Sequence, residues 1–239
     1  MKTQKMKSAV RSLTAGILVG VAGLAGLVQG ASAQTNAVAQ APQSPIKTSG
    51  NVTYFLGADS NVGAPTSYAE INHKTTFPYS TSVSGFLDFY NGNNGYFGKT
   101  VVEKGLAENL NLRSHIEHIN SPLSRVGAGL SYSIPGMPKG TFGKISYLPY
   151  FADNRGEHVE NRQIAAFVAG ASLPHNLSIL TFGEMNVAGA EGVQWCYGEV
   201  ELAKNFGRFS VGANLQLNGQ GTGRATPEVV PRISVRARF

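Results

Sequence analysis

The sequence predicts an all-β fold, a transmembrane antiparallel β-barrel of about 12 strands in meander order. Three observations predict it: segments of alternating apolar and polar residues recur, turn-forming sequences separate them, and the chain ends in such a segment at Phe239. In that last segment Ile233, Val235 and Ala237 alternate with Arg and Ser. Because successive side chains of a strand point to opposite faces, the segment has one apolar and one polar, mostly charged face.

A membrane accounts for the sharp difference between the two faces. One face would meet lipid, where an Arg at mid-depth costs roughly 2–4 kcal/mol, and the other a watery lumen that tolerates charge. Lipid leaves no partner for an open sheet edge, so strands in a membrane must close into a barrel. A secreted β-sandwich or jelly roll is the alternative, since its strands also alternate. The terminal Phe239, the regular strand lengths and the short connections favour the barrel.

The N-terminus reads as an export signal rather than as part of the fold. Residues 1–33 combine a basic start, an apolar stretch over 13–28 and the small-residue site Ala31-Ser32-Ala33, which resembles a secretory signal peptide. A single membrane-spanning helix is the alternative for this stretch. Residues 34–48 lack periodicity and are expected to form a disordered periplasmic lead-in, which leaves 49–239 for the barrel.

Charge and cysteine content narrow the function. The chain has 20 basic and 14 acidic residues, a net charge of +6. Four of the basic residues lie within 1–33, so the exported chain would carry 16 − 14 = +2. This balance removes the case for a nucleic-acid partner. Cys196 is the one cysteine, which excludes an intramolecular disulfide and indicates a small apolar residue.

The strands differ in how clearly they alternate. The clearest are 109–118, 125–134, 206–218 and the C-terminal segment 232–239. In 206–218, for example, Phe209, Val211 and Leu215 share one face, while Asn214 and Gln216 lie on the other. The segments 176–187 and 192–204 lose their alternation part-way, which predicts a β-bulge. The remaining expected strands are 51–59, 66–75, 81–90, 96–106, 141–151 and 161–173.

The connections and the aromatic residues fit the same arrangement. Turn sequences such as Asn91-Gly92 and Pro135-Gly136 separate the strands. With both barrel ends in the periplasm, the two longest connections, near 152–160 and 218–227, would lie outside, as is usual for such barrels. Aromatic residues near strand ends are expected to form an interfacial girdle: Phe77, Tyr79, Phe89, Tyr90, Tyr96, Tyr147, Phe151, Trp195, Tyr197 and Phe206.

The polar faces would line the lumen, where acidic and basic residues nearly cancel. These charges either hold a narrow lumen together through cross-strand pairs or form a constriction that selects solutes. The mixed signs argue against a general pathway for polyanions. The residues expected to line the lumen and contact solute are Phe86, Asp88, Tyr90, Arg113, Glu117, Glu199, Glu201, Arg208 and Arg236.

Several short stretches resemble the nucleoside-specific outer-membrane channels. They are residues 84–90 (SGFLDFY), Tyr96-Phe97-Gly98-Lys99, 111–114 (NLRS), Tyr147-Leu148-Pro149-Tyr150 and Phe182-Gly183-Glu184. The resemblance implies a monomeric, narrow barrel of twelve strands in which aromatic and charged lumen residues touch the solute. The expected function is passive diffusion of small polar solutes, nucleoside-like ones among them, across a bacterial outer membrane. The expected partners are outer-membrane lipid, these solutes and the barrel-assembly machinery, which would bind the C-terminal strand ending in Phe239.

Other functions receive less support from the sequence. A non-conducting structural or adhesive barrel is one alternative, and a lipid-modifying hydrolase is another. The His-x-Ser pair that such hydrolases use does not occur, so we expect no enzyme and no catalytic residue. His115 and Glu117 share a strand face but His118 lies on the other, and two ligands do not make a metal site. No metal and no cofactor are therefore expected.

Overall fold

The computed structural model is a closed barrel of twelve antiparallel strands. It describes residues 45–57, 67–90, 96–119, 124–153, 157, 159, 162–189, 192–219 and 228–239, with the backbone alone for Tyr90, Ile119 and Gly189. The strands are β1 (Lys47–Gly57), β2 (Ser67–Phe77), β3 (Thr81–Tyr90), β4 (Tyr96–Ala107), β5 (Leu110–Ile119), β6 (Ser124–Ser133), β7 (Thr141–Asp153), β8 (Ile164–Leu173), β9 (Leu177–Gly189), β10 (Gly192–Phe206), β11 (Phe209–Asn218) and β12 (Glu228–Arg238).

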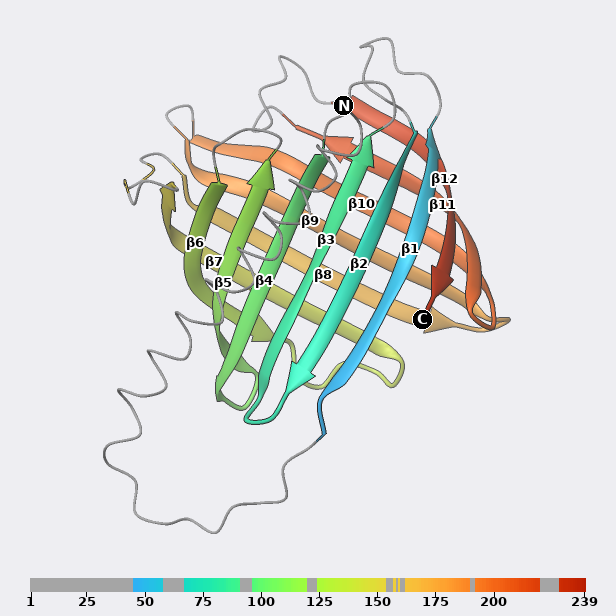
Figure 1. Cartoon of the computed structure of the whole chain (residues 1–239), viewed down its shortest axis with the longest axis horizontal. Helices are drawn as coiled ribbons and strands as arrows, with labels where there is room; N and C mark the ends of the chain where they lie inside the picture. Colours follow the sequence, from blue (N-terminus) through green and yellow to red (C-terminus); the bar gives the residue numbers. More distant parts are fainter. Residues whose placement is uncertain are drawn as a thin grey trace, which may run out of the picture.

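Each strand pairs with its neighbours in sequence, and β1 pairs with β12 to close the ring (Figure 1). The seam runs in register from Asn51 opposite Arg238 to Gly57 opposite Arg232. Beyond the last strand residue, Phe239 exchanges two backbone hydrogen bonds with Gly50, at 3.0 and 3.2 Å. Since every strand has two partners, the described sheet has no open edge, which confirms the predicted meander barrel.

The two ends of the barrel differ in their connections. The end that carries the start of β1 and the end of β12 has tight turns, which Figure 1 shows at the lower side of the barrel. At this end β10 and β11 are joined by two residues, with Gly207 at φ 63°. At the other end, nine residues separate β1 from β2 and ten separate β7 from β8. The two ends of the barrel thus differ in the length of their longest connections, as expected.

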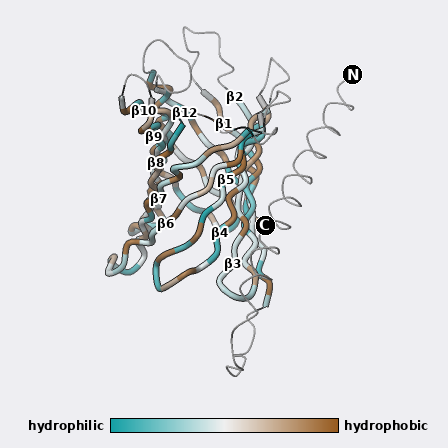
Figure 2. Tube along the Cα trace, turned by 90° about the vertical axis from the view of Figure 1, so that its left-hand side faces the viewer, coloured by the Kyte–Doolittle hydropathy of each residue, from teal (hydrophilic) through white to brown (hydrophobic). Residues whose placement is uncertain are grey.

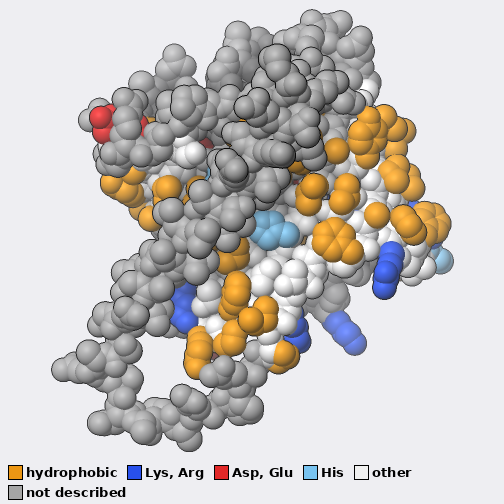
Figure 3. All heavy atoms as spheres, in the orientation of Figure 1, with side chains coloured by type: hydrophobic (Ala, Val, Ile, Leu, Met, Phe, Trp, Pro, Cys, Tyr) orange, Lys and Arg blue, Asp and Glu red, His pale blue; other side chains and the backbone are white. Residues whose placement is uncertain are grey.

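The two faces of the wall separate as the alternation predicts. In β11, Val211 and Leu215 are 46% and 49% exposed, while Ser210 and Asn214 are each 2% exposed. The hydropathy of the trace alternates along the strands (Figure 2), and hydrophobic side chains spread over the visible outer surface (Figure 3). A monomeric water-soluble fold rarely exposes so many large apolar side chains, whereas a bilayer favours them. Within the described chain, no helix is long and apolar enough to cross a membrane.

The observed strands fall where the sequence places them, with differences of a few residues at their ends. The β9–β10 ladder has register shifts between Gly192 and Gln194 and between Trp195 and Tyr197, so the predicted bulge is confirmed. Two further shifts, in β4–β5 and in β6–β7, have no counterpart in the sequence prediction. β1 begins at Lys47, within the stretch expected to be a lead-in. The expected signal peptide, residues 1–33, lies outside the described residues.

Three features of the alternation differ from expectation. In β8 the side chains of Ile164, Ala166 and Val168 share the inward face, because they pair with inward-facing residues of β7 and β9. Phe151 and Tyr197, expected in an aromatic girdle, also face inward, and Phe151 is fully buried. Phe151 packs with Leu148, Ile164 and Cys196 in a buried apolar cluster. In this part of the barrel, apolar side chains fill the interior beside the polar ones.

Candidate functional site

The candidate site is the barrel interior, and its central feature is an ion pair between opposite walls. Lys99 lies on β4 and Glu184 on β9, five strands apart in a ring of twelve. Lys99 Nζ donates to Glu184 Oε1 at 2.5 Å. Both side chains are largely enclosed, at 11% and 18% exposed. A direct contact between strands this far apart crosses the lumen, so these two side chains limit its open cross-section at this level.

We call the inward side of β4 to β8, together with Arg162, the basic wall. On it two of the carboxylates, Glu103 and Glu117, are each shared by more than one cation. Glu103 accepts from Arg113 at 3.1 Å and from Lys144 at 2.6 Å. Glu117 accepts from Arg162 and lies 3.9 Å from Arg125 Nη1. Among the described residues, the inward charges of this wall are five basic and three acidic, a net of +2: Lys99, Arg113, Arg125, Lys144 and Arg162 against Glu103, Glu117 and Asp153.

We call the inward side of β9 to β12 and β1 to β3 the acidic wall. Here carboxylates are bound partly by neutral donors. Glu199 accepts from the Tyr197 hydroxyl at 2.9 Å and from the Asn214 amide. Glu70 accepts from Asn72 at 2.5 Å. The described inward charges of this wall are six acidic and five basic, a net of −1. The acidic ones are Glu70, Asp88, Glu184, Glu199, Glu201 and Glu228, and the basic ones are Lys47, Lys74, Arg232, Arg236 and Arg238.

The acidic wall also has an ordered aromatic patch. The rings of Phe55 and Tyr68 stack with centroids 4.6 Å apart. Arg232 lies over Tyr68 at 4.9 Å from its centroid, and its Nη1 donates to the Tyr68 hydroxyl at 3.0 Å. The nearby Arg236 donates to Glu201 Oε2 at 2.7 Å. These contacts fix both arginines in place, because each guanidinium is held by a second group in a defined direction.

The structure places most predicted lining residues inside the barrel. Asp88, Glu117, Glu199 and Glu201 are buried inward, and Arg113 and Arg236 join the ion pairs described above. Phe86 also faces inward, with its ring 5.7 Å from that of Phe97. Tyr90 ends β3, and its side chain lies outside the described part of the structure. Whether any of these residues contacts a solute stays a prediction.

Arg208 differs from the sequence expectation in its position. It was expected in a strand beginning at 206, with its side chain in the lumen. The structure places it in the exposed turn between Phe206 and Phe209. The physical reason is the two-residue hairpin, in which Gly207 at positive φ and Arg208 make the reversal. The strand therefore starts at Phe209, three residues later than the alternation predicts.

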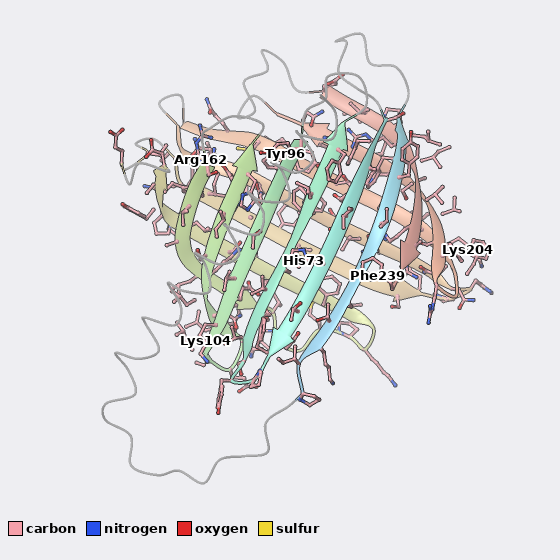
Figure 4. All side chains as sticks on the ribbon, in the orientation of Figure 1. His73, Tyr96, Lys104, Arg162, Lys204 and Phe239 are labelled. Atoms are coloured by element: carbon pink, nitrogen blue, oxygen red, sulfur yellow. The ribbon has the colours of Figure 1, made fainter. Side chains whose placement is uncertain are left out.

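The sequence prediction misses two features of the site, the Lys99–Glu184 pair and Arg162. Alternation cannot pair Lys99 with Glu184, because they are 85 residues apart. Arg162 was not expected there at all. It precedes β8, and Figure 4 shows it at the loop end of the barrel, opposite the end that carries Lys104. Arg162 lies within the expected strand 161–173, and it shares the parity of Ile164 and Ala166, so their inward orientation would have placed it on the inward face.

The two histidines of β5 lie on different faces of the strand. His115 faces inward, 3.6 Å from Glu117, while His118 faces outward and meets Thr100 Oγ1 at 3.3 Å. The two imidazoles thus lie on opposite sides of the wall, as the strand period predicts. No group of three metal-ligating side chains occurs among the described residues. Ser121 and His158 lie outside them.

The comparison with solved structures supports the fold, whereas the comparisons by sequence find no match. No family model matches the chain, and no curated protein matches it by sequence. Among solved structures it is similar to the KdgM porin, with 9% identity and a TM-score of 0.53 over 80% of this chain and 99% of that one. A KdgM porin in complex with disordered oligogalacturonate gives 10% identity and a TM-score of 0.52 over the same shares. The NanC porin gives 13% identity and a TM-score of 0.50, over 80% of this chain and all of that one.

Proposed function

We propose that the chain is exported by a cleaved signal peptide and forms a narrow outer-membrane channel for passive diffusion of small polar solutes. The observation that carries this proposal is a closed barrel with an apolar exterior and a polar interior. The ion pair of Lys99 with Glu184 crosses this interior. Enclosing charged and polar groups costs free energy even when they are paired. A channel needs such a lining, because these groups solvate the molecule that passes. The similarity to two porins supports the same function.

The size and sign of the lining narrow the class of solute. The described inward charges of the two walls, +2 and −1, nearly cancel, so we do not extend to this chain the oligogalacturonate seen with the KdgM porin. A nucleoside is one candidate, because the inward pairs Phe86–Phe97 and Phe182–Tyr197 present ring faces to the lumen. Nucleosides added as blockers of the current would test this narrower proposal.

A non-conducting structural barrel is the second candidate, and one observation favours it. Many inward side chains are almost fully enclosed, including Phe55, Thr53 and Ser234, each at 1% exposed or less. In this case the ion pairs and the cluster around Phe151 would only hold the wall together. No bound partner or catalytic group has to be assumed for this role.

Single-channel recording in planar bilayers separates the two candidates. Purified, refolded protein should give discrete current steps in salt. The double variant Lys99→Ala/Glu184→Ala should give steps about twofold larger or more, because it removes the contact that spans the lumen. Lys104→Ala, on the outer face of the same strand, is the matched control and should leave the step size unchanged. Absence of steps from both the native chain and the double variant would support the structural barrel.

A further inference from the structure

The charges of the lumen are separated by side rather than mixed. The basic wall and the acidic wall, defined above, carry described inward net charges of +2 and −1. The hydrogen bonds of the two walls point the same way as the count. On the basic wall two cations converge on Glu103 and two on Glu117. On the acidic wall Glu199 and Glu70 receive neutral donors. A local surplus of each sign therefore faces the other across the lumen.

The Lys99–Glu184 pair links these two walls. Lys99 comes from the basic wall and Glu184 from the acidic wall, whereas the other ion pairs described above each join residues of a single wall. Its direction follows the polarity of the lumen, with an ammonium on one side and a carboxylate on the other. A molecule that carries both groups can replace it, because its carboxylate can take the place of Glu184 on Lys99 and its ammonium the place of Lys99 on Glu184.

We propose that the channel favours small zwitterions, in which an ammonium and a carboxylate are separated along the molecule, over singly charged molecules of similar size. This inference rests on the proposed channel function. A solute of one sign is attracted by one wall and repelled by the other. A zwitterion aligned across the lumen is attracted by both, and narrow walls of low dielectric strengthen this field. A zwitterion also leaves neither Lys99 nor Glu184 without a counter-charge while it passes.

Uptake of isotope-labelled solutes into proteoliposomes tests the proposal. The solutes are 4-aminobutyrate, butyrate, n-butylammonium and neutral butyramide, which have similar sizes and differ in charge. We expect 4-aminobutyrate to enter about fivefold faster or more than either ion. Equal rates for the zwitterion and the ions, with rapid entry of butyramide, would overturn the preference while leaving the channel intact. If butyramide and the other three all fail to enter, the proposed channel function fails and the inference fails with it.

Two charge exchanges at the same net charge separate the transverse field from total charge. Lys144→Glu/Glu199→Lys exchanges charges between the walls and brings the described net charges of the basic and acidic walls to 0 and +1. The opposite surpluses that face each other across the lumen are then gone, so the preference should disappear. Lys144→Glu/Glu103→Lys exchanges the partners of a 2.6 Å ion pair within the basic wall, so the charges of the walls and the preference ratio should be retained. Loss of the preference in both variants, or in neither, would contradict the proposal.

Folding of each variant is checked by heat-modifiable gel migration. If the first exchange does not fold, the milder Lys144→Gln/Glu199→Gln lowers the described net charge of the basic wall to +1 and brings that of the acidic wall to zero. It should lower the ratio of zwitterion to ion uptake by about half or more while butyramide uptake continues. An unchanged ratio in this variant would count against the proposal in the same way.

Discussion

An arginine placed on the outer face of β11 should destabilise the barrel according to its depth in the membrane. Ala213 lies at the middle of β11 and pairs with outward-facing Leu202 and Ile233. An Arg at the bilayer midplane costs roughly 2–4 kcal/mol, and near the interface about 0–1 kcal/mol. We therefore expect Ala213→Arg to lower the free energy of unfolding by about 3 kcal/mol and Phe209→Arg, at the end of the strand, by under about 1 kcal/mol.

The matched control places the same residue on the inner face. Gln216 is buried in the lumen, opposite Glu199 on β10, and its Nε2 donates to Asn218. The Arg side chain is two bonds longer than that of Gln, but at this position it would meet the Glu199 carboxylate, so Gln216→Arg should change the unfolding free energy by about 1 kcal/mol or less. Ala213→Leu controls for side-chain size on the outer face and should be neutral.

Urea unfolding from phospholipid vesicles, followed by tryptophan fluorescence, measures these changes. Trp195 is the single tryptophan of the chain, and its Nε1 donates to the Leu217 carbonyl oxygen at 3.1 Å, so it reports on the β10–β11 region. With a denaturant dependence of about 2 kcal/mol per molar urea, the midpoint for Ala213→Arg should fall by about 1.5 M. If Gln216→Arg is the more damaging change, or if Ala213→Arg costs no more than Phe209→Arg, the outer face does not meet hydrocarbon.

Three further outcomes follow from single positions. At Gly129 an added Cβ would lie 2.0 Å from the Tyr147 carbonyl oxygen, at the β6–β7 register shift. Gly129→Val should therefore sharply reduce the folded, heat-modifiable fraction, whereas the control Ala128→Val on the outer face should not. Equal folded fractions for the two variants would contradict the close approach. Cys196 lies in the buried cluster with Phe151, so maleimide should label it slowly in the folded protein and rapidly in urea, and immediate labelling of the folded form would contradict this placement. Phe239→Ala keeps the backbone bonds to Gly50, so it should refold normally in detergent yet assemble more slowly with the barrel-assembly machinery; equal assembly rates would remove Phe239 as a recognition element.

The strand number and the two faces of each clear strand could be predicted from the sequence because they are local properties. In β11, Val211 and Leu215 alternate with Ser210 and Asn214, and the structure gives the expected difference in exposure. The prediction weakened where alternation is broken or absent. Gly207 and Arg208 fall within the alternating segment 206–218 but form a turn, and β8 turns apolar side chains inward beside the cluster around Phe151.

The sequence by itself thus determined a twelve-stranded wall with an apolar and a polar side, because the period of a strand decides which neighbours share a face. The tertiary structure decided which polar side chains meet: Lys99 with Glu184, Arg162 with Glu117, and the basic wall opposite the acidic one. These partnerships depend on the closure of the ring, the stagger between strands and the bulges at β4–β5, β6–β7 and β9–β10. None of these is a property of a single segment, since each is fixed only when all twelve strands are in register.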